Sequence, residues 1–514
     1  MDPCSYSGGM TSRTVAIIGA GPAGLACGRW LKREGFEPVL YEQACRIGGQ
    51  WSGDPVCSGV WPSLCTNTGR DMTEFSDLSH SPGTPLYPSN AAMYEYLLRY
   101  VDKFDLVDRV RLRTRVEHVE AAPGGTWVVR ASCDGEVREE RFERVVVASG
   151  RFNDPVLPTV PGLCGFAGEG GVIHTFHCKD PVAFRGRRVL IGGCAVSALE
   201  LACEAVSQGA SRVVCANRRQ RYILPKNVAG VPIENVIHTR LSALVREALP
   251  LPEVMEELKA FIVRACGTPE RYGAPKPHED LLAAGITQCQ FFLPLLAEGR
   301  LNVRPWITGV GGERVHFGDG SSEVFDTLVF GTGFRLHLPF LSDAIRKALA
   351  LDAGRMELND FTFHPRLPGL AFAGLFQVAG PYLPPIELQA RWIAYAWSGV
   401  RELPTADAWQ SGASNSQHLP EHVHHMPSLT LAFARNAGVE PRLEDWPELA
   451  DALLLGPLLP AGFRLSGRDS TLDAAARIRM GGSTAAAERI DSPERRALLR
   501  KFTERRRNLA LGET

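Results

Sequence analysis

The spacing of hydrophobic and polar positions divides much of the chain into two similar units of strand, helix and strand. The apolar run TVAII at residues 14–18 predicts a buried strand, a helical pattern follows up to Gly35, and residues 39–42 predict the next strand. The stretch at 187–219 repeats this order. Two such units predict an α/β fold with two Rossmann-like domains, each suited to a dinucleotide.

The rest of the pattern is more varied. Residues 91–105 predict a helix, and alternation between 111 and 150 around the turn signals APGG and CDGE predicts a small antiparallel meander. A helical stretch is expected at 231–298. Further strands are expected at 301–317, in DTLVFGTGF (326–334) and at 369–375, followed by a helix in IELQARWIAYAWSGV (386–400).

Beyond residue 403 the pattern weakens. The segment SPERRALLRKFTERRR still predicts a last helix, with Ser492 as its N-cap and Pro493 at its first position. The many arginines of this helix favour a solvated or packing face over a site for a membrane or an anion.

Composition narrows the class of partner. A chain of 514 residues is long enough for about three domains, and its formal net charge of -1 gives no field that would favour nucleic acid. No apolar run approaches the roughly 18–20 residues of a membrane span, and the polar N-terminal stretch MDPCSYSGGMTSRT has no signal-peptide pattern. The 13 scattered cysteines form no CxxC pair and no metal-ligand spacing, so we expect free thiols, no metal and a cytoplasmic location.

The first candidate site is the glycine motif GAGPAG that follows the strand at 14–18. Gly19 permits a tight turn, Gly21 lets the backbone approach a pyrophosphate, and Gly24 lets the helix pack closely on the strand. Glu42 ends the second strand, where a carboxylate accepts hydrogen bonds from the hydroxyls of a ribose. An acid at this position favours FAD or NAD over NADP.

A second glycine pair follows in RIGGQW. Gly49 suits a close approach of the backbone to a cofactor, and we expect Gln50 and Trp51 to lie beside that cofactor. A β-turn next to a core tryptophan is the plainer alternative.

The second unit departs from the glycine pattern. It reads GGCAVSA, so that Gly193 keeps the turn and Ser197 lies in the first turn of the helix, but Ala195 carries a Cβ where a pyrophosphate needs bare backbone. Its second strand ends in ANRRQR rather than in an acid. Arg218 and Arg219 therefore stand where the 2′-phosphate of NADPH would lie, although a solvated strand end is the alternative.

Opposite ribose chemistry in the two units predicts FAD in the first and NADPH in the second, with hydride passing between them. Because VVVASG and LVFGTGF flank the second unit, we expect the NADPH domain to be inserted into the FAD domain and to move against it. The expected ranges are 1–165 and 331–410 for the two parts of the FAD-binding domain, 166–330 for the NADPH-binding domain with its helical insertion at 231–298, and 411–514 for a C-terminal extension.

Residues 60–80, VWPSLCTNTGRDMTEFSDLSH, follow neither a helical nor a strand period. Together with GAGPAGL, YEQACRIGGQW, VVVASGRFNDPVLP, LVFGTGF and GLAFAGLFQVAGPYLPPIELQARW, they resemble the flavin-containing monooxygenases, the N- and S-oxygenating branch of the class B flavoprotein monooxygenases. The segments occur in the family's order between residues 13 and 400, and LLLGPLLPAGFRLSG resembles the family's C-terminal segment.

The resemblance implies an NADPH- and O2-dependent enzyme that forms a C4a-hydroperoxyflavin and oxygenates a nucleophilic nitrogen or sulfur of a small molecule. In the family, the Asn of the TN pair lies beside the flavin, which implies a catalytic role for Asn67 with Thr66 beside it. An amide donates and accepts hydrogen bonds without carrying a charge. Cofactor contacts are further expected at Leu64, Val116, Thr332 and Gln389.

Two departures from the family pattern bear on the reaction. The family fingerprint F-x-G-x-x-x-H-S/T-x-x-Y/F is matched by Phe166 and Gly168, but His174 comes two residues late and Cys178 holds the aromatic position. The altered fingerprint therefore does not distinguish an enzyme that oxygenates nitrogen or sulfur from one that oxygenates ketones. Ala195 puts tight NADPH binding, and hence efficient coupling, in doubt.

Three alternatives therefore stay open beside the monooxygenase: a Baeyer–Villiger monooxygenase, an uncoupled NADPH oxidase, and a non-catalytic binding protein with nucleotide folds. We expect a small-molecule substrate and O2 as partners, no nucleic acid, no transmembrane segment, and possible assembly as a homodimer.

Overall fold

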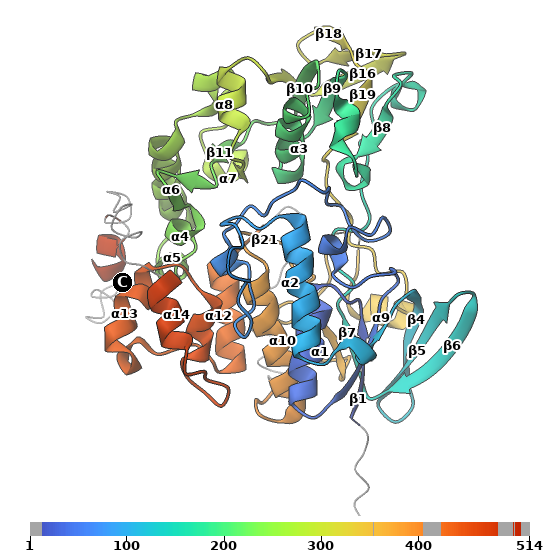
Figure 1. Ribbon diagram of the computed structural model, residues 1–514, viewed down its shortest axis with the longest axis vertical. Helices are drawn as coiled ribbons and strands as arrows, with labels where there is room; N and C mark the ends of the chain where they lie inside the picture. Colours follow the sequence, from blue (N-terminus) through green and yellow to red (C-terminus); the bar gives the residue numbers. More distant parts are fainter. Residues whose placement is uncertain (1–12, 353, 404–422, 482–496, 498, 505–514) are drawn as a thin grey trace, which may run out of the picture.

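The computed structural model describes residues 13–352, 354–403, 423–481, 497 and 499–504. In Figure 1 the sheet that contains β1 lies below with α1, α2 and α10, and the sheet that contains β9 and β10 lies above with α3. The helices α4 to α7 run down one side, from the upper part towards the C-terminal helices α12 to α14. The chain therefore bridges its two halves a second time, away from the crossing segments between the two sheets.

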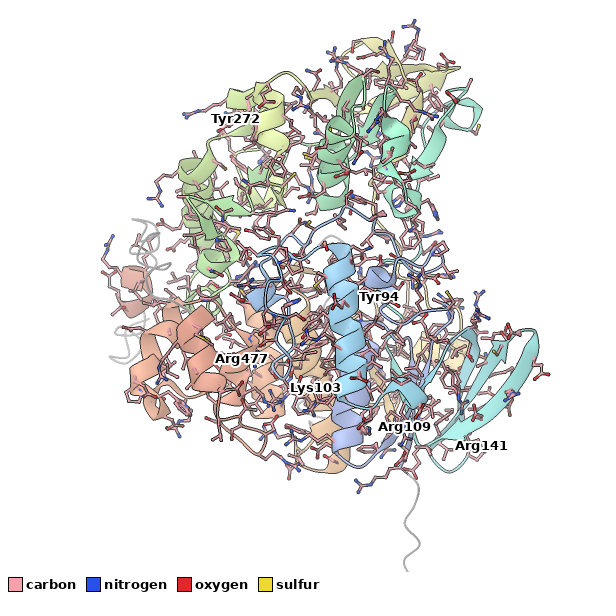
Figure 2. The ribbon with its side chains drawn as sticks, viewed as in Figure 1. Tyr94, Lys103, Arg109, Arg141, Tyr272 and Arg477 are labelled. Atoms are coloured by element: carbon pink, nitrogen blue, oxygen red, sulfur yellow. The ribbon has the colours of Figure 1, made fainter. Side chains whose placement is uncertain are left out.

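The first half contains a fully parallel sheet in the order β20 (Leu370–Phe372), β7 (Arg144–Val147), β1 (Thr14–Ile18), β2 (Glu37–Tyr41) and β3 (Val110–Arg111). The strand β1 has the predicted bounds, because four of its five side chains are buried. The helices are α1 (Pro22–Arg33), α2 (Asn90–Lys103), α9 (Asp343–Ala348) and α10 (Leu383–Ser398). Tyr94 on α2 packs its ring against the glycine turn at Gly48 (Figure 2).

The second half contains another parallel sheet, in the order β15 (Asn302–Pro305), β10 (Arg212–Asn217), β9 (Arg188–Gly192), β19 (Thr327–Phe330) and β8 (Gly171–His174). The helix α3 (Val196–Ser207) connects β9 to β10. The chain leaves the first sheet after β7 and returns to it only at β20. These two sheets confirm the α/β fold with two Rossmann-like units, while the domain boundaries remain a prediction.

The smaller sheets are antiparallel or short. The meander expected between 111 and 150 is confirmed as three antiparallel strands, β4 (Thr114–Ala122), β5 (Thr126–Cys133) and β6 (Glu136–Phe142). The second half adds the antiparallel strands β16 (Ile307–Gly311), β17 (Arg314–Phe317) and β18 (Ser322–Val324). Two further strand pairs are β12 (Asn227–Val228) with β13 (Val231–Pro232), and β21 (Val378–Ala379) with β22 (His424–His425).

The insertion at 231–298 is less uniformly helical than predicted. Its helices are α4 (Glu234–Ile237), α5 (Arg240–Ala248), α6 (Leu251–Cys266), α7 (Leu281–Ala284) and α8 (Phe292–Ala297). Between α7 and α8, the strand β14 (Ile286–Gln288) pairs with β11 (Tyr222–Leu224). A three-residue strand gives too short a periodic signal to be separated from helix in the sequence.

The C-terminal part is also more ordered than its pattern suggested. It contains α12 (Met426–Ala437), α13 (Ala450–Leu455) and α14 (Ala474–Gly481), and α12 packs against both α10 and α5. A fully buried ion pair of 2.6 Å between Arg391 of α10 and Asp469 fixes this part to the first half. The predicted caps of the last helix, Ser492 and Pro493, lie outside the described residues. No helix in the described part of the chain is both long and apolar enough to cross a bilayer.

Candidate active site

The first glycine motif has the geometry of a dinucleotide turn. Gly19 has a φ of +106°, and a Cβ on Gly24 would lie 1.9 Å from the carbonyl oxygen of Gly19, so neither position accepts a side chain. A Cβ on Gly21 would meet only Gly49, at an ordinary 3.5 Å. The packing of the protein therefore does not require glycine at position 21, whereas the approach of a phosphate to the N-terminus of α1 does.

Glu42 is buried at the end of β2, beside this turn. Its two carboxylate oxygens accept hydrogen bonds of 2.9 Å from the backbone N–H groups of Ala20 and Ala44. Burial raises its pKa above the ordinary value. A carboxylate has about four acceptor sites, so these two bonds leave capacity for a ribose hydroxyl.

The turn at Gly48 and Gly49 folds back onto the first motif. The N–H of Gly48 donates to the carbonyl of Ala20 at 2.9 Å, and a Cβ on Gly49 would lie 3.0 Å from the Cα of Gly21. Gln50 follows, and its amide nitrogen donates to the carbonyls of Cys57 and Phe152. The turn is therefore part of the same backbone cradle as the first motif, and Gln50 ties it to the segment that leaves the first sheet after β7.

The irregular stretch at 60–80 is held by single hydrogen bonds instead of a ladder. The N–H groups of Thr66 and Arg70 donate to the carbonyls of Pro88 and Leu86, at 2.9 and 2.8 Å. From the other side, Arg477 of α14 forms an ion pair of 2.6 Å with Glu74 (Figure 2). The segment is thus fixed without a helical or strand period.

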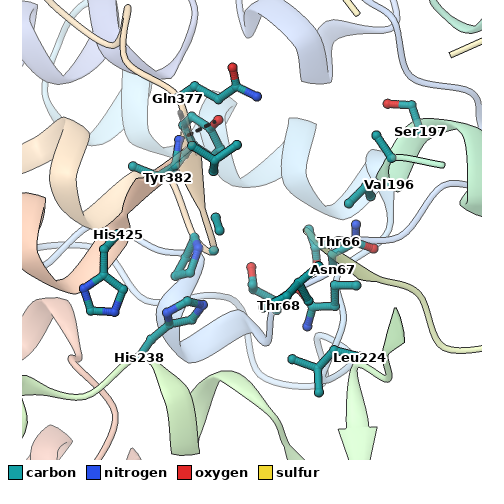
Figure 3. A pocket seen from close by; sticks show the side chains of 18 of the residues that line it. Thr66, Asn67, Thr68, Val196, Ser197, Leu224, His238, Gln377, Tyr382 and His425 are labelled. Carbon is teal, nitrogen blue, oxygen red and sulfur yellow. Dashed lines mark hydrogen bonds between the residues drawn. The ribbon is translucent and has the colours of Figure 1, made fainter. Parts of the chain in front are cut away.

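Asn67 lies on the wall of the large cavity, next to Thr66 and Thr68 (Figure 3). Its side-chain oxygen Oδ1 is buried and has no hydrogen-bond partner among the described residues. The hydroxyl of Thr66, in contrast, donates to the carbonyl of Thr68 at 2.7 Å. The free amide is therefore that of Asn67, and Thr66 supports the loop that presents it.

The second half of the molecule also holds this loop. Lys226 pairs with Glu200 at 3.2 Å, and its Nζ lies 3.5 Å from the carbonyl oxygen of Thr66. The carboxylate of Glu234 accepts a hydrogen bond from the N–H of Gly69, and burial raises its pKa to about 7. No motif in the sequence singles out Lys226 or Glu234, because their contacts with the loop span 160 and 165 positions of the chain.

The cavity has a volume of about 1260 Å³. It exceeds the roughly 300–1,000 Å³ of a site for one drug-sized ligand, as expected for a cavity that holds more than one. Gln50, Trp51, Asn67, Ser197 and Thr332 line it together, so the structure brings residues of both nucleotide units to one place. Its apolar wall comes from the insertion, through Leu241, Val245, Val254, Met255, Leu258 and Phe261.

The N-terminus of α3 opens into this cavity. Ala195 is the N-cap residue with a φ of −89°, close to the −76° of Gly21 at the corresponding position of α1. Neither cap residue has a side chain that satisfies the first amides of its helix, and Ser197 is exposed towards the cavity. Both helix ends therefore offer free N–H groups to an anion, although Ala195 narrows the approach by one methyl group.

The two predicted phosphate-binding arginines differ in their surroundings. The guanidinium of Arg218 lies over the ring of Trp306, 4.9 Å from its centroid, whereas Arg219 donates to the carbonyl of Ala283 at 3.0 Å. Neither of them lines the large cavity. Arg221 does line it, beside the glycine turn of the second unit, and burial lowers its pKa. Arg218 thus has the freer guanidinium of the two, and Arg221 is an additional cation that the sequence argument missed.

Replacement of Arg218 by Ala is expected to raise the KM for NADPH about tenfold and to change the KM for NADH less than about twofold, because one charge-assisted contact to a phosphate is lost. Steady-state oxidation of both nucleotides measures this ratio. Arg300, which pairs with Glu298 outside the cavity lining, provides the control Arg300→Ala. An equal change for NADPH and NADH would show that Arg218 does not contact the 2′-phosphate.

The other predicted cofactor contacts divide into two groups. Leu64 and Thr332 line the cavity together with Trp51. Val116 and Gln389 do not line it: Val116 packs its side chain into the core beneath β4. The amide of Gln389 is fully buried, accepts from the N–H of Gly374 at 2.9 Å, and donates to Thr362, Phe361 and Phe372. In this structure the side chains of Val116 and Gln389 are therefore structural.

The segments that cross between the two halves are joined to each other. The N–H of Val156 donates to the carbonyl of Gly333 at 3.0 Å, and Arg335 forms an ion pair of 3.0 Å with Asp154. His174 is buried against this crossing, with its ring 5.1 Å from that of Phe334. Despite its late position in the fingerprint, His174 lies at the linker. Phe176, which lines the cavity, also contacts Phe334, and Cys178 lies in the core.

His238, at the end of α4, makes stability depend on pH. Burial lowers its pKa to about 4, so the unfolded chain binds a proton below the ordinary value of 6.5 and the folded chain does not. The free energy of unfolding should fall as the pH drops from 6.5 to 4, by up to about 3 kcal/mol. Glu234, with its pKa raised to about 7, acts in the opposite direction.

The contribution of His238 is therefore measured as a difference between variants. In urea unfolding at neutral pH and at about pH 5, His238→Gln should lose less stability on acidification than the parent chain. The exposed His316 of β17 supplies the control His316→Gln. Identical pH dependence in parent and His238→Gln would contradict the buried neutral imidazole.

Two dinucleotide-binding folds that face one large cavity are typical of flavoproteins that use a second nucleotide cofactor. The chain belongs to the flavin-binding monooxygenase-like family, whose model matches residues 12–478. Its cofactors are FAD and NADPH, and the uncapped ends of α1 and α3 fit the pyrophosphates of both.

Similar proteins agree with this assignment. The chain is 30% identical over 483 residues to dimethylaniline monooxygenase (N-oxide-forming) 2 of Rattus norvegicus. The match covers 88% of this chain and 89% of that protein. S-allyl-L-cysteine S-oxygenase from Allium sativum has the same fold, with 22% identity, a TM-score of 0.62 and coverage of 96% and 98%. Cyclohexanone monooxygenase from Rhodococcus sp. Phi1 bound to NADP+ matches with 20% identity, a TM-score of 0.62 and coverage of 84% and 98%.

Proposed function

We propose that this enzyme uses NADPH and O2 to oxygenate a nucleophilic nitrogen or sulfur atom of a small molecule, with Asn67 as the residue beside the reacting atoms. The observation that carries the proposal is the unpaired Oδ1 of Asn67 on the wall of a cavity shared by both nucleotide units. The family assignment and a relative named for N-oxide formation support the reaction type.

When FAD is bound and reduced by NADPH, it would provide the chemistry that activates O2. The chain contributes positions and a dry environment. Gly19, Gly21, Gly24, Gly49 and Glu42 would hold the adenosine and pyrophosphate of FAD. Gly193, Ser197, Arg218 and Arg219 would hold NADPH. The apolar side chains of α5 and α6 exclude water from the same cavity, which suppresses the loss of reduced oxygen as H2O2.

The deciding experiment is NADPH consumption under air with panels of amines, thioethers and ketones, combined with product analysis. N-oxides or S-oxides formed in proportion to NADPH would support the proposal. Esters or lactones as the main products would favour the Baeyer–Villiger alternative. H2O2 formed in proportion to NADPH even with substrate present would favour the uncoupled oxidase, to which Ala195 points.

The remaining expectations are part of the proposal. We place the boundaries of the two FAD-binding parts at 1–165 and 331–410, of the NADPH-binding domain at 166–330 and of the C-terminal extension at 411–514. A homodimer and a cytoplasmic location stay predictions, testable by light scattering and by fractionation of cells.

A further inference from the structure

The cavity has a second polar end, away from Asn67, lined by residues of α5 and β22. Arg246 of α5, His238 and His425 line this end, and Figure 3 places the two histidines beside each other on one side of the cavity. Arg246 lies on α5, and α5 packs against α12, the helix whose N-cap residue is His425. None of these residues belongs to a nucleotide motif.

Arg246 has no hydrogen-bond or ion-pair partner among the described residues, although it is only partly exposed. The acidic side chains that line the cavity are already paired: Glu200 with Lys226 at 3.2 Å, Glu257 with Lys501 at 2.9 Å, and Asp352 with Arg355 at 3.2 Å. The cavity therefore contains a cation that the protein itself does not neutralise. An unpaired, half-buried charge is costly unless a ligand pairs with it.

The two histidines add neutral hydrogen-bonding groups. His238 is 6% exposed, and its Nδ1 has no partner in the described part of the chain. His425 is hydrogen-bonded through Nδ1 to Ser428 at 2.9 Å. Burial lowers the pKa of both rings, so each is neutral and has one N–H donor and one acceptor nitrogen. Together with Arg246 they form a site with donors and a single positive charge.

We propose that this end of the cavity binds a carboxylate of the substrate, so that the enzyme oxygenates thioethers or amines that carry a carboxylate. A carboxylate matches the planar fork of one guanidinium and its single charge, whereas a phosphate dianion would keep an unpaired charge. Leu241, Val245 and Met255 line the same cavity and suit the hydrocarbon part of such a molecule. This inference rests on the proposed function of Asn67 at the other end.

Binding tests the inference without turnover. Pentanoate is the unreactive counterpart of 3-(methylthio)propanoate, with CH2 in place of sulfur, and pentanamide is its neutral analogue. The FAD-loaded protein is titrated calorimetrically with these two compounds and with longer alkanoates and alkanamides. The longer chains are included because the distance between the Asn67 end and the Arg246 end of the cavity is not known. Within a matched pair the acid should bind at least about tenfold more tightly than the amide, and Arg246→Gln should abolish that difference.

Turnover tests it independently. For ω-(methylthio)alkanoates, Arg246→Gln should raise KM about tenfold and leave kcat nearly unchanged, with little effect on the corresponding amides. Arg246→Lys keeps the positive charge but lacks the planar guanidinium, so it should retain part of the preference for acids over amides. This variant replaces Arg246→Gln in the test if Arg246→Gln does not fold. Arg271→Gln, at an exposed arginine of the same insertion outside the cavity lining, should match the parent chain.

The outcomes separate the two proposals. Tight binding of the acids, lost in Arg246→Gln, without oxygenation of any thioether would sustain the carboxylate site and reject the proposed reaction. Oxygenation of thioethers with equal affinity for acids and amides, or with equal losses for both in Arg246→Gln, would overturn the carboxylate site alone.

Discussion

Asn67→Ala should retain FAD and oxidise NADPH under air, while formation of oxygenated product falls on the order of 100-fold, as for the loss of one preorganised hydrogen-bonding group. The reduced oxygen should then appear as H2O2. The reason is local: Oδ1 of Asn67 has no hydrogen-bond partner among the described residues, whereas the hydroxyl of Thr66 donates to the carbonyl of Thr68. Paired assays of NADPH, H2O2 and product measure the coupling.

Asn90 provides a matched control for this experiment. Its Oδ1 is likewise buried without a partner among the described residues, but Asn90 lies at the start of α2 and does not line the cavity. Asn90→Ala should keep the coupling of the parent chain. Unchanged coupling in Asn67→Ala would remove this residue from the reaction, and equal losses in both variants would indicate a structural effect.

The parts of the fold that the sequence predicts well are those with a strong local signal. TVAII is buried along almost its whole length, and the glycine turn after it is required by contacts within a few residues, as the position of Gly24 against Gly19 shows. The prediction was weaker for the insertion and for the region after residue 403. There, short elements such as β14 and α13 are stabilised by packing on distant parts of the chain.

The candidate site divides in the same way. Asn67 and the glycine motifs could be found because they lie within contiguous motifs. Lys226, Glu234 and Arg246 could not, since each is placed by tertiary contacts and none has a neighbour that marks it in the sequence. Gln389 illustrates the converse: it belongs to a matching segment, but its amide supports Gly374 instead of lining the cavity. Matching a motif thus locates a region and does not by itself assign a contact.

Gly21→Ala should weaken FAD binding at least about tenfold while the protein without FAD keeps its fold. The added methyl group has room within the protein, since its only neighbour is Gly49 at 3.5 Å, so the loss arises where the pyrophosphate approaches the N-terminus of α1. Titration of the apoprotein with FAD, followed by flavin fluorescence, gives the dissociation constant. Circular dichroism of the same samples reports the fold.

Two further variants, Gly24→Ala and Ala195→Gly, separate the loss of FAD binding from the loss of the fold and test the same position in the second unit. Gly24→Ala places a Cβ 1.9 Å from the carbonyl oxygen of Gly19, so it should lose folded protein as well as FAD. Ala195→Gly removes the methyl group at the corresponding position of α3 and should lower the KM for NADPH and reduce H2O2 formation. If Gly21→Ala bound FAD as tightly as the parent chain, close backbone approach at Gly21 would be refuted. The methyl group of Ala195 could then no longer explain weak coupling.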